Sequence, residues 1–382
     1  VIDTGIDFNH PDLIPNLILP QINVREDGMT DILDDSGHGT AVMGVIGGVG
    51  NNQIGVAGIN WTVSIVPIRA AGGPFLDCDL FDEVEGIDAA REAGVNVINL
   101  SIGGLGTISV ERTAVTAAYN AGIVICSAAG NANPGVYYKA TGDLQTDWQN
   151  LYYPAALPEV IGVGAVTNEG VKADFSNYGE DILSVMAPGV DIITTVPDYE
   201  CYLYTGEGPP YGKASGTSFA TPMVAGVAAL ILSHYPGLSP DDVRARIEGS
   251  ATPMTGPDDN HNGVDDYYGY GILNAEGALS QSPTAGNQYM RVAMFQSPTF
   301  PSELVIMVKA LVTFDKPPTI DWSIKGSSTA GSFTLNEVET RPLLYIGRIT
   351  PGENGIINII VNAIHEGSVV TPVRVSRTFS DE

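Results

Sequence analysis

Short β-branched runs alternate with alanine-rich stretches through the first part of the chain, and this alternation constrains the fold more than any other feature. The strand-like runs lie at 64–70 ("SIVPIRA"), 95–104 ("VNVINLSIGG") and 123–131 ("IVICSAAGN"), and helix-like stretches at 80–94 and 110–122 separate them. Strands that alternate with helices pair in parallel, with helices on both faces of the sheet. The sequence therefore predicts an α/β domain of three layers, α/β/α, with a mainly parallel sheet whose sites lie at the carboxyl ends of the strands.

The alternation stops near residue 280, and a different pattern follows it. Residues 281–286 have the composition of a linker, and the strand-like runs beyond them are separated by Pro and Gly and include no convincing helix. Such a pattern is typical of an all-β sandwich. We therefore expect one domain over 1–280, a linker over 281–286 and an accessory β-sandwich domain over 287–382, with Trp322 as a candidate core residue.

The composition narrows the classes of partner. The 382 residues include 44 acidic and 17 basic side chains, a net charge of −27, and nearly all of the acidic excess precedes residue 283. A surface this acidic repels nucleic acid, so we expect no nucleic-acid partner. No run approaches the roughly 18 apolar residues that a membrane helix needs, so we expect no membrane span. The three cysteines have neither an even count nor a metal-ligand spacing, so no disulfide framework is predicted.

Three segments combine a reactive side chain with crowded small residues. They are "VIDTGID" around Asp3, "DDSGHGTAVMGVIGG" around His38 and "ASGTSFATPMVAG" around Ser218. A serine hydroxyl is a weak nucleophile at neutral pH, so it needs a base within hydrogen-bond reach and a third group that orients the base. Asp, His and Ser in this chain order form one of the known versions of such a triad.

These segments resemble the three signature motifs of the subtilisin-like serine peptidases, the subtilase family, and the likeness covers about residues 1–280. The resemblance implies that Asp3 orients the imidazole of His38, that His38 is general base and then general acid, and that Ser218 is the nucleophile. It also implies that the side-chain amide of Asn131, in "SAAGN", and the backbone N–H of Ser218 form the oxyanion hole. The implied activity is that of a monomeric serine endopeptidase, which cleaves protein or peptide substrates through an acyl-enzyme.

The same resemblance implies a substrate-binding region. The segment "LSIGG" is similar to the family strand that pairs with the substrate backbone, and its glycines leave room for an extended peptide to add as a strand. Tyr152 falls where subtilisins have a small residue at the floor of the primary specificity pocket. We therefore expect a shallower pocket and a preference for apolar residues at P1, the residue on the acyl side of the cleaved bond. The expected substrate-binding residues are Ser101, Ile102, Gly103, Gly104, Ala128, Ala129, Gly130 and Tyr152.

Two segments are candidates for structural calcium. "NHPDL" and "GNNQIGVAG" resemble the strong calcium site of subtilisins, and the implied ligands are Asp12, Gly50, Asn52, Ile54 and Val56. The family site also takes a ligand from near the N-terminus that this chain does not contain, so the site is expected to be incomplete. The segment "DDNHNGVDD" fits the start of a calcium-binding loop, with Asp258, Asn260, Asn262 and Asp266 as candidate ligands, and an acidic surface turn is the equal alternative.

Two rival functions fit parts of the sequence. Aspartic peptidases also use D-[ST]-G motifs, which occur here at Asp3 and Asp35. Two lobes would have to supply those acids, and the short interval between them is too small to build a lobe. The second rival is a catalytically inactive binding or adhesion protein on the same fold.

The chain begins at Val1, inside a strand-like run that delivers Asp3 at its end. In the family a further segment precedes this acid, so we interpret the start as an N-terminal truncation. A pro-segment is then expected upstream, and an extracellular location is implied by the resemblance. On this interpretation we expect the 382-residue chain to fold poorly or to have weak activity when it is made alone.

Overall fold

The structure is a computed structural model of the chain. It describes residues 1–18, 21–25, 31–73, 77–140, 146, 149–179, 181–203, 210–254, 256, 265–280, 290–296, 304–310, 314–324, 329–338, 341–349, 355–365, 368–369 and 373–379.

The helices of the first domain follow the alanine-rich stretches of the sequence. Asp79 begins one of them by accepting a hydrogen bond from the Phe81 N–H, and Ser239 begins another through a reciprocal capping box with Asp242. The described helices are η1 (Ile14–Asn16), α1 (His38–Gly47), α2 (Leu80–Glu92), α3 (Ser109–Asn120), α5 (Thr217–His234), α6 (Pro240–Ser250) and α7 (Ala275–Ser280).

Seven parallel strands form the central sheet, in the order β11-β10-β8-β6-β1-β3-β2. Strand β1 lies between β6 and β3 and is only two residues long, and its Ile2 pairs with Leu100 on one side and Ile68 on the other. The strands are β1 (Ile2–Asp3), β2 (Ile22–Asn23), β3 (Ile68–Arg69), β6 (Val97–Leu100), β8 (Val124–Ala128), β10 (Val160–Val166) and β11 (Val185–Pro188).

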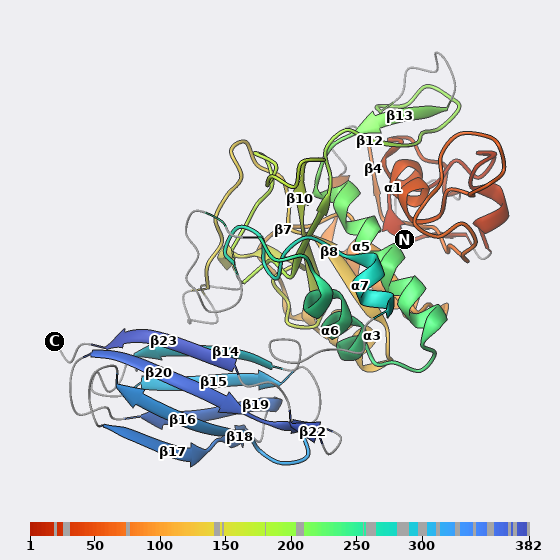
Figure 1. The fold of residues 1–382 in the computed structure, drawn as a ribbon. Coiled ribbons are helices and arrows are strands. Elements are labelled where there is room, and N and C mark those ends of the chain that lie inside the picture. Colours follow the sequence, from red (N-terminus) through yellow and green to blue (C-terminus); the bar gives the residue numbers. More distant parts are fainter. Residues whose placement is uncertain are drawn as a thin grey trace.

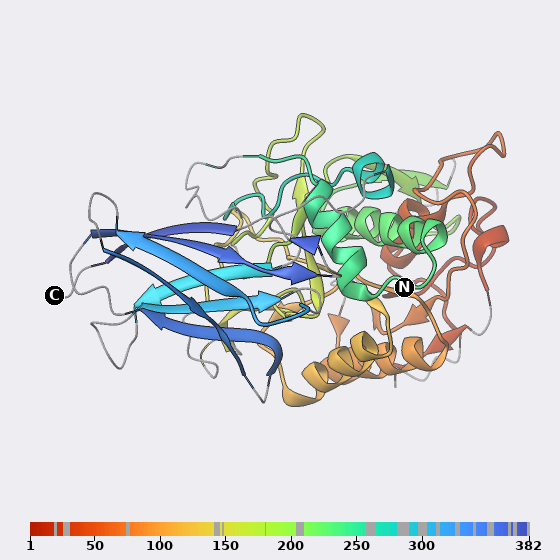
Figure 2. The ribbon, with the colours of Figure 1, turned by 60° about the horizontal axis from the view of Figure 1, so that its bottom comes forward.

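Helices cover both faces of this sheet, which confirms the three-layer prediction (Figures 1 and 2). Strand β8 shows why: its Ile125 belongs to the core that α2 and α3 complete, whereas Val124 and Cys126 belong to the core that α5 and α6 complete. Successive side chains of a strand point to opposite faces, so an uninterrupted apolar run suits a strand that is buried on both sides.

Helix α5 is the buried centre of one helical layer. Its window of 18 residues is apolar enough, by length and composition, to cross a membrane, but 67% of that window is buried inside the protein. The helix contacts β6, β8, β10 and β11. Among the described residues, this core helix is the one segment that passes the membrane-span criterion, and its burial gives it a structural explanation.

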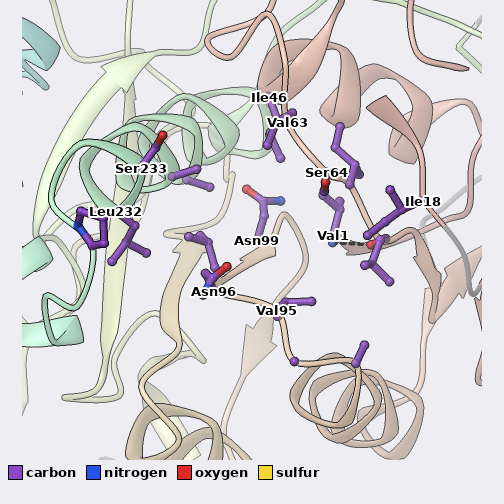
Figure 3. Close-up of a pocket in the computed structure, with 18 of the residues that line it drawn as sticks. Val1, Ile18, Ile46, Val63, Ser64, Val95, Asn96, Asn99, Leu232 and Ser233 are labelled. Atoms are coloured by element: carbon purple, nitrogen blue, oxygen red, sulfur yellow. Dashed lines mark hydrogen bonds between the residues drawn. The ribbon is translucent and has the colours of Figure 1, made fainter. Parts of the chain in front are cut away.

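A cavity of about 540 Å³ lies at the amino edge of the sheet, beside Val1 (Figure 3). The residues before β6 and the end of α5 form much of its wall, and Asn99 projects into it. Asn99 is 2% exposed, and its Oδ1 atom has no hydrogen-bond partner. This cavity is separate from the carboxyl edge of the sheet, where the sequence predicts the site.

The C-terminal part consists of two four-stranded antiparallel sheets, of order β14-β15-β19-β18 and β17-β16-β20-β23. One hydrophobic core joins them: Ile306 and Val308 come from the first sheet, and Ile320 and Ile359 from the second. Trp322 is partly buried against this core, so the predicted sandwich is confirmed. The strands are β14 (Met290–Gln296), β15 (Leu304–Ala310), β16 (Thr319–Ile324), β17 (Ala330–Thr334), β18 (Asn336–Val338), β19 (Arg341–Ile349), β20 (Gly355–Asn362) and β23 (Val373–Phe379).

Four two-stranded antiparallel pairs complete the described structure. They are β4 (Ala71–Gly72) with β5 (Asp77–Cys78), β7 (Gly104–Leu105) with β9 (Tyr152–Tyr153), β12 (Ile192–Thr195) with β13 (Tyr211–Ala214), and β21 (Ile364–His365) with β22 (Ser368–Val369). The linker predicted at 281–286 lies outside the described residues.

One buried carboxyl group in the α2–α3 layer has a predictable effect on stability. Glu83 of α2 is 5% exposed, and its Oε1 atom has no hydrogen-bond partner. Burial, reinforced by the neighbouring carboxylate of Glu111, raises the pKa of Glu83 from 4.5 to about 8. Between these two pH values the unfolded chain releases a proton that the folded chain keeps, so the free energy of unfolding falls as the pH rises.

We therefore expect Glu83→Gln to stabilise the protein at pH 9 by about 5 kcal/mol relative to the unsubstituted chain. The difference should vanish below the unfolded pKa of 4.5, where the carboxyl group is protonated in both states. Chemical unfolding of both proteins from pH 4 to pH 9 measures it. Glu85→Gln, at an exposed position of the same helix, is the matched control and should show no such trend. A stability difference that is constant with pH would contradict the prediction.

Candidate active site

The four residues predicted to carry the chemistry lie at the ends of central elements. Asp3 is the last residue of β1, and His38 is the first residue of α1. Ser218 is the second residue of α5, and Asn131 lies just beyond β8. Because β1 and β8 are parallel strands of one sheet, their carboxyl ends face the same edge.

Asp3 and His38 form a buried pair. The Asp3 side chain is fully buried, and its Oδ1 atom accepts hydrogen bonds from His38 Nδ1, at 2.7 Å, and from the Thr4 N–H, at 2.8 Å. A proton on Nδ1 leaves Nε2 as the basic nitrogen of the neutral ring. Asp3 therefore fixes both the tautomer and the orientation that a general base requires.

The environment of His38 sets its basicity. Burial acts to lower the pKa of the imidazole, but the charge and hydrogen bond of Asp3, together with the charge of Asp34, raise the pKa above its ordinary value. A base whose pKa lies near the working pH transfers protons efficiently. Sequence reasoning identified both members of this pair.

Asp34 is a residue beside the predicted site that sequence reasoning missed. Its fully buried carboxylate accepts four hydrogen bonds, from Thr4 Oγ1, from the Gly37 N–H and from both the N–H and the hydroxyl of Thr40. Burial raises the pKa of Asp34, while these hydrogen bonds act to lower it. The carboxylate binds the N–H groups at the start of α1, and it thereby positions His38. The one sequence feature that could have indicated Asp34 is its position, four residues before His38 in "DDSGHGT".

Ser218 is next in sequence to a residue that contacts the imidazole of His38. Its neighbour Phe219 packs its ring on that of His38, with centroids 5.4 Å apart. The Ser218 hydroxyl donates to the carbonyl of Ser101 at 3.1 Å, and among the described hydrogen bonds none joins Ser218 to His38. Rotation of one side-chain torsion redirects a serine hydroxyl, and catalytic hydrogen bonds of free enzymes often form only with substrate.

Asn131 presents an amide donor beside the serine. Its Oδ1 atom accepts hydrogen bonds from the Thr217 N–H, at 2.9 Å, and from the Thr217 hydroxyl, at 3.1 Å. Because these donors occupy the oxygen, the amide nitrogen is the end that remains to donate. A side-chain carbon placed on Gly216 would lie 3.5 Å from Asn131 Nδ2 and 3.6 Å from the Ser218 nitrogen, so both donors border the same space. Two such donors suit a developing oxyanion.

The segment predicted to pair with substrate lies next to the serine. The Ser101 hydroxyl donates to the Ser218 carbonyl at 2.8 Å, and Ile102 is buried beneath the segment. Gly103 and Gly104 are exposed, and a side-chain carbon on Gly104 would meet no atom within 4 Å. The segment therefore has open space at Gly104, whereas a side-chain carbon on Gly103 would meet the Tyr153 carbonyl at 2.6 Å.

The facing segment is more occupied than the sequence suggests. Ala128 and Ala129 are buried, the Ala129 carbonyl accepts a hydrogen bond from Asn177 Nδ2, and the Gly130 carbonyl accepts one from the Asn177 N–H. Tyr152 lies between the two segments, and its hydroxyl donates to the Gly103 carbonyl at 2.9 Å. The structure thus brings all eight predicted substrate-binding residues into one region. The carbonyls of Ala129 and Gly130, however, already accept hydrogen bonds from Asn177.

The structure brings the predicted ligands of the first calcium site together. The buried Asp12 carboxylate accepts hydrogen bonds from Asn52 Nδ2, at 2.5 Å, and from the Val56 N–H, at 2.8 Å. The Ile54 N–H donates to Asn52 Oδ1 at 3.2 Å, and a side-chain carbon on Gly50 would collide with the Trp61 ring. Both carboxylate oxygens of Asp12 therefore accept N–H hydrogen bonds from the loop. In this arrangement they face hydrogen-bond donors, so the predicted ligands fit calcium only partly.

The second candidate calcium loop is described only in part. Asp258, Asn260 and Asn262 lie outside the described residues. Asp266 is described and accepts a hydrogen bond from the Tyr137 hydroxyl at 3.0 Å. Within the described ranges, no cluster of three or more His, Cys, Asp or Glu side chains is arranged to hold a metal ion.

The two acids of the aspartic-peptidase rival have different partners. Asp3 faces His38, whereas the half-exposed Asp35 carboxylate lies 3.6 Å from the Arg69 guanidinium and accepts a hydrogen bond from the Gly73 N–H. Each carboxylate therefore belongs to its own local network, and neither network resembles a pair of carboxyl groups that share a proton.

Known proteins show the same pattern over the first domain. A model of the subtilase family matches residues 1–271. Subtilisin amylosacchariticus of Bacillus subtilis subsp. amylosacchariticus is 37% identical over 286 residues, 73% of this chain and 64% of the relative. Subtilisin of Bacillus pumilus is 36% identical over 286 residues, 73% of this chain and 89% of that protein.

A third relative, the thermophilic serine proteinase of Bacillus sp. (strain AK1), is 35% identical over 284 residues, 73% of this chain and 61% of the relative. The chain thus spans somewhat less than two thirds of the length of several curated relatives that it matches. The family match nevertheless covers most of the chain, and it coincides with the parallel sheet and its helices. The protein belongs to the subtilase family.

Proposed function

We propose that the protein is a serine endopeptidase that hydrolyses peptide bonds through an acyl-enzyme on Ser218. The observation that carries the proposal is the buried hydrogen bond of 2.7 Å between Asp3 and His38, next to a serine at the start of an apolar core helix. In this proposal His38 takes the proton of the Ser218 hydroxyl as the oxygen attacks the carbonyl, and it returns that proton to the leaving amine. Water then repeats the sequence on the acyl-enzyme.

The oxyanion of each tetrahedral intermediate would be bound by the Asn131 amide and the Ser218 N–H. The anchoring of Asn131 through Thr217 supports this role, because a donor that is already oriented needs no reorganisation when the charge develops. The Ser218 N–H also lies at the positive end of α5, which favours negative charge.

The substrates we propose are proteins and peptides, bound in extended form along Ser101 to Gly104 with apolar residues at P1. Calcium binding at the Asp12 loop is also part of the proposal. The convergence of Asp12, Asn52 and Val56 supports it, and the Asn52 amide would have to turn its oxygen to the ion. The extracellular location remains a proposal that rests on the family.

One observation favours a second candidate function, a binding protein without catalysis. The Ser218 hydroxyl bonds to the Ser101 carbonyl instead of to His38. If that bond were permanent, the base could not activate the nucleophile.

Reaction with a fluorophosphonate probe discriminates between the two functions, because such a probe modifies serines that a neighbouring base activates. We expect the folded protein to be labelled and Ser218→Ala to lose the label completely. Ser233→Ala, at an exposed serine near the other end of α5, is the matched control and should be labelled fully. Circular dichroism establishes that each variant is folded. A folded protein that gives no Ser218-dependent label would support the binding protein instead.

A further inference from the structure

Two segments border the space in front of Ser218. Residues 101–104 continue from β6, and residues 129–131 continue from β8, and these two strands are neighbours in the central sheet. When the carbonyl carbon of a substrate is bonded to the Ser218 oxygen and the carbonyl oxygen lies at Asn131, that carbon lies between the two segments. The side chain of the residue that carries this carbon can then enter the slot between the two segments, which continue from neighbouring strands of one sheet.

The ring of Tyr152 occupies this slot. A side-chain carbon on Gly103 would lie 3.0 Å from Tyr152 Cε1, and one on Gly130 would lie 2.4 Å from Tyr152 Cζ. These two glycines belong to opposite walls, so one aromatic ring touches both walls. The ring fits there only because neither wall carries a side chain at these positions.

The hydroxyl and the backbone of Tyr152 hold the ring in place. The hydroxyl donates to the Gly103 carbonyl at 2.9 Å, and in β9 the backbone of Tyr152 pairs with Leu105 of β7. The Tyr138 ring contacts the same ring at a centroid distance of 6.1 Å. Burial, with smaller contributions from Tyr138 and Glu83, raises the pKa of Tyr152 to about 12, so the hydroxyl keeps the proton that it donates.

We propose that Tyr152 closes the P1 pocket and restricts this enzyme to substrates with Gly or Ala at the acyl position. This inference rests on the proposed function and sharpens it, because it replaces a general preference for apolar residues with a limit on size. On this proposal a methyl group is accommodated in front of the ring, whereas a leucine or phenylalanine side chain collides with it. Displacing the ring costs its hydrogen bond and its packing on both walls, so larger residues react more slowly.

The experiment compares two peptide anilides that differ only at P1, one with Ala and one with Phe. We expect the unsubstituted protein to hydrolyse the Ala substrate with a kcat/KM at least about tenfold higher than the Phe substrate. Tyr152→Gly opens the slot and should raise kcat/KM for the Phe substrate by about tenfold or more, so that the preference reverses. Tyr152→Ala is a second opening variant, which covers the case that Tyr152→Gly does not fold.

Tyr152→Phe is the matched control, because it keeps the ring and removes only the hydroxyl. It should retain the preference for Ala, with a smaller ratio than the unsubstituted protein. A Phe substrate cleaved as fast as the Ala substrate by the unsubstituted protein would overturn the inference, as would an unchanged ratio in both opening variants. Fluorophosphonate labelling of the same preparations separates the two proposals: Ser218-dependent labelling with no effect of Tyr152 contradicts the pocket alone, whereas no labelling and no hydrolysis contradicts both.

Discussion

Replacing Asp3 with asparagine should lower kcat for peptide hydrolysis by about 10⁴-fold, the size of the loss seen when the corresponding acid of another serine peptidase is replaced in this way. The reason lies in the single oxygen, Oδ1, that accepts the His38 Nδ1 proton. An amide at this position can donate to Nδ1, which places the imidazole proton on Nε2, the nitrogen that must accept the proton of Ser218. Steady-state hydrolysis of a peptide anilide with Ala at P1 measures the loss.

The pH profile tests the same residue in a second way. Since Asp3 is the main group that raises the pKa of His38, activity of the unsubstituted protein should fall with acid at a pH above the ordinary histidine value of 6.5. In Asp3→Asn the fall should move to lower pH. Asp35→Asn changes the other D-[ST]-G acid, whose carboxylate pairs with Arg69, and it should leave the profile unchanged. A profile in Asp3→Asn identical to that of the unsubstituted protein would show that Asp3 does not act through His38.

The second large effect is expected at Asn131. Asn131→Leu removes the side-chain donor of the oxyanion hole and should lower kcat by about 10²- to 10³-fold, or about 3 to 4 kcal/mol of transition-state stabilisation, with little change in KM. The split between kcat and KM matters, because a donor that acts only on the developing charge contributes little to binding of the uncharged substrate.

A second substitution separates this role from the structural one. In Asn131→Asp, an oxygen remains to accept the Thr217 hydrogen bonds, but the donor is replaced by a negative charge. We expect activity at least as low as in Asn131→Leu, with the thermal stability of the unsubstituted protein largely kept. Near-normal kcat in Asn131→Asp would show that the amide is not an oxyanion donor.

The architecture followed from local patterns in the sequence. Strand β8 could be predicted because its apolar residues follow one another without a break. This local pattern is typical of a strand that is buried on both faces. The same holds for α5, whose sequence is apolar almost all round. The chemical residues could be located because each lies at the end of such an element, where small residues crowd around a reactive one.

Other features depend on contacts between distant segments, which a single sequence does not display. Asp34 is one acid among many in this chain, and its role arises only when Gly37 takes a positive φ of 91° and the N–H groups of α1 turn towards the carboxylate. The burial of Glu83 beside Glu111 needs α2 and α3 to be packed together. The identity of Tyr152 suggested a shallow pocket, but its contact with both Gly103 and Gly130 required the structure.

The ring of Phe219 on the imidazole has a consequence for chemical durability. The residue after the nucleophile is close enough to the reacting atoms that an added oxygen there would disturb them, and a thioether at this position would be open to conversion to a sulfoxide. Phenylalanine has no sulfur to oxidise. The Sγ atom of Cys201 packs on Gly37, the residue before His38. An oxidant that reaches Cys201 would convert a thiol, and reductants can reverse the first step of that damage.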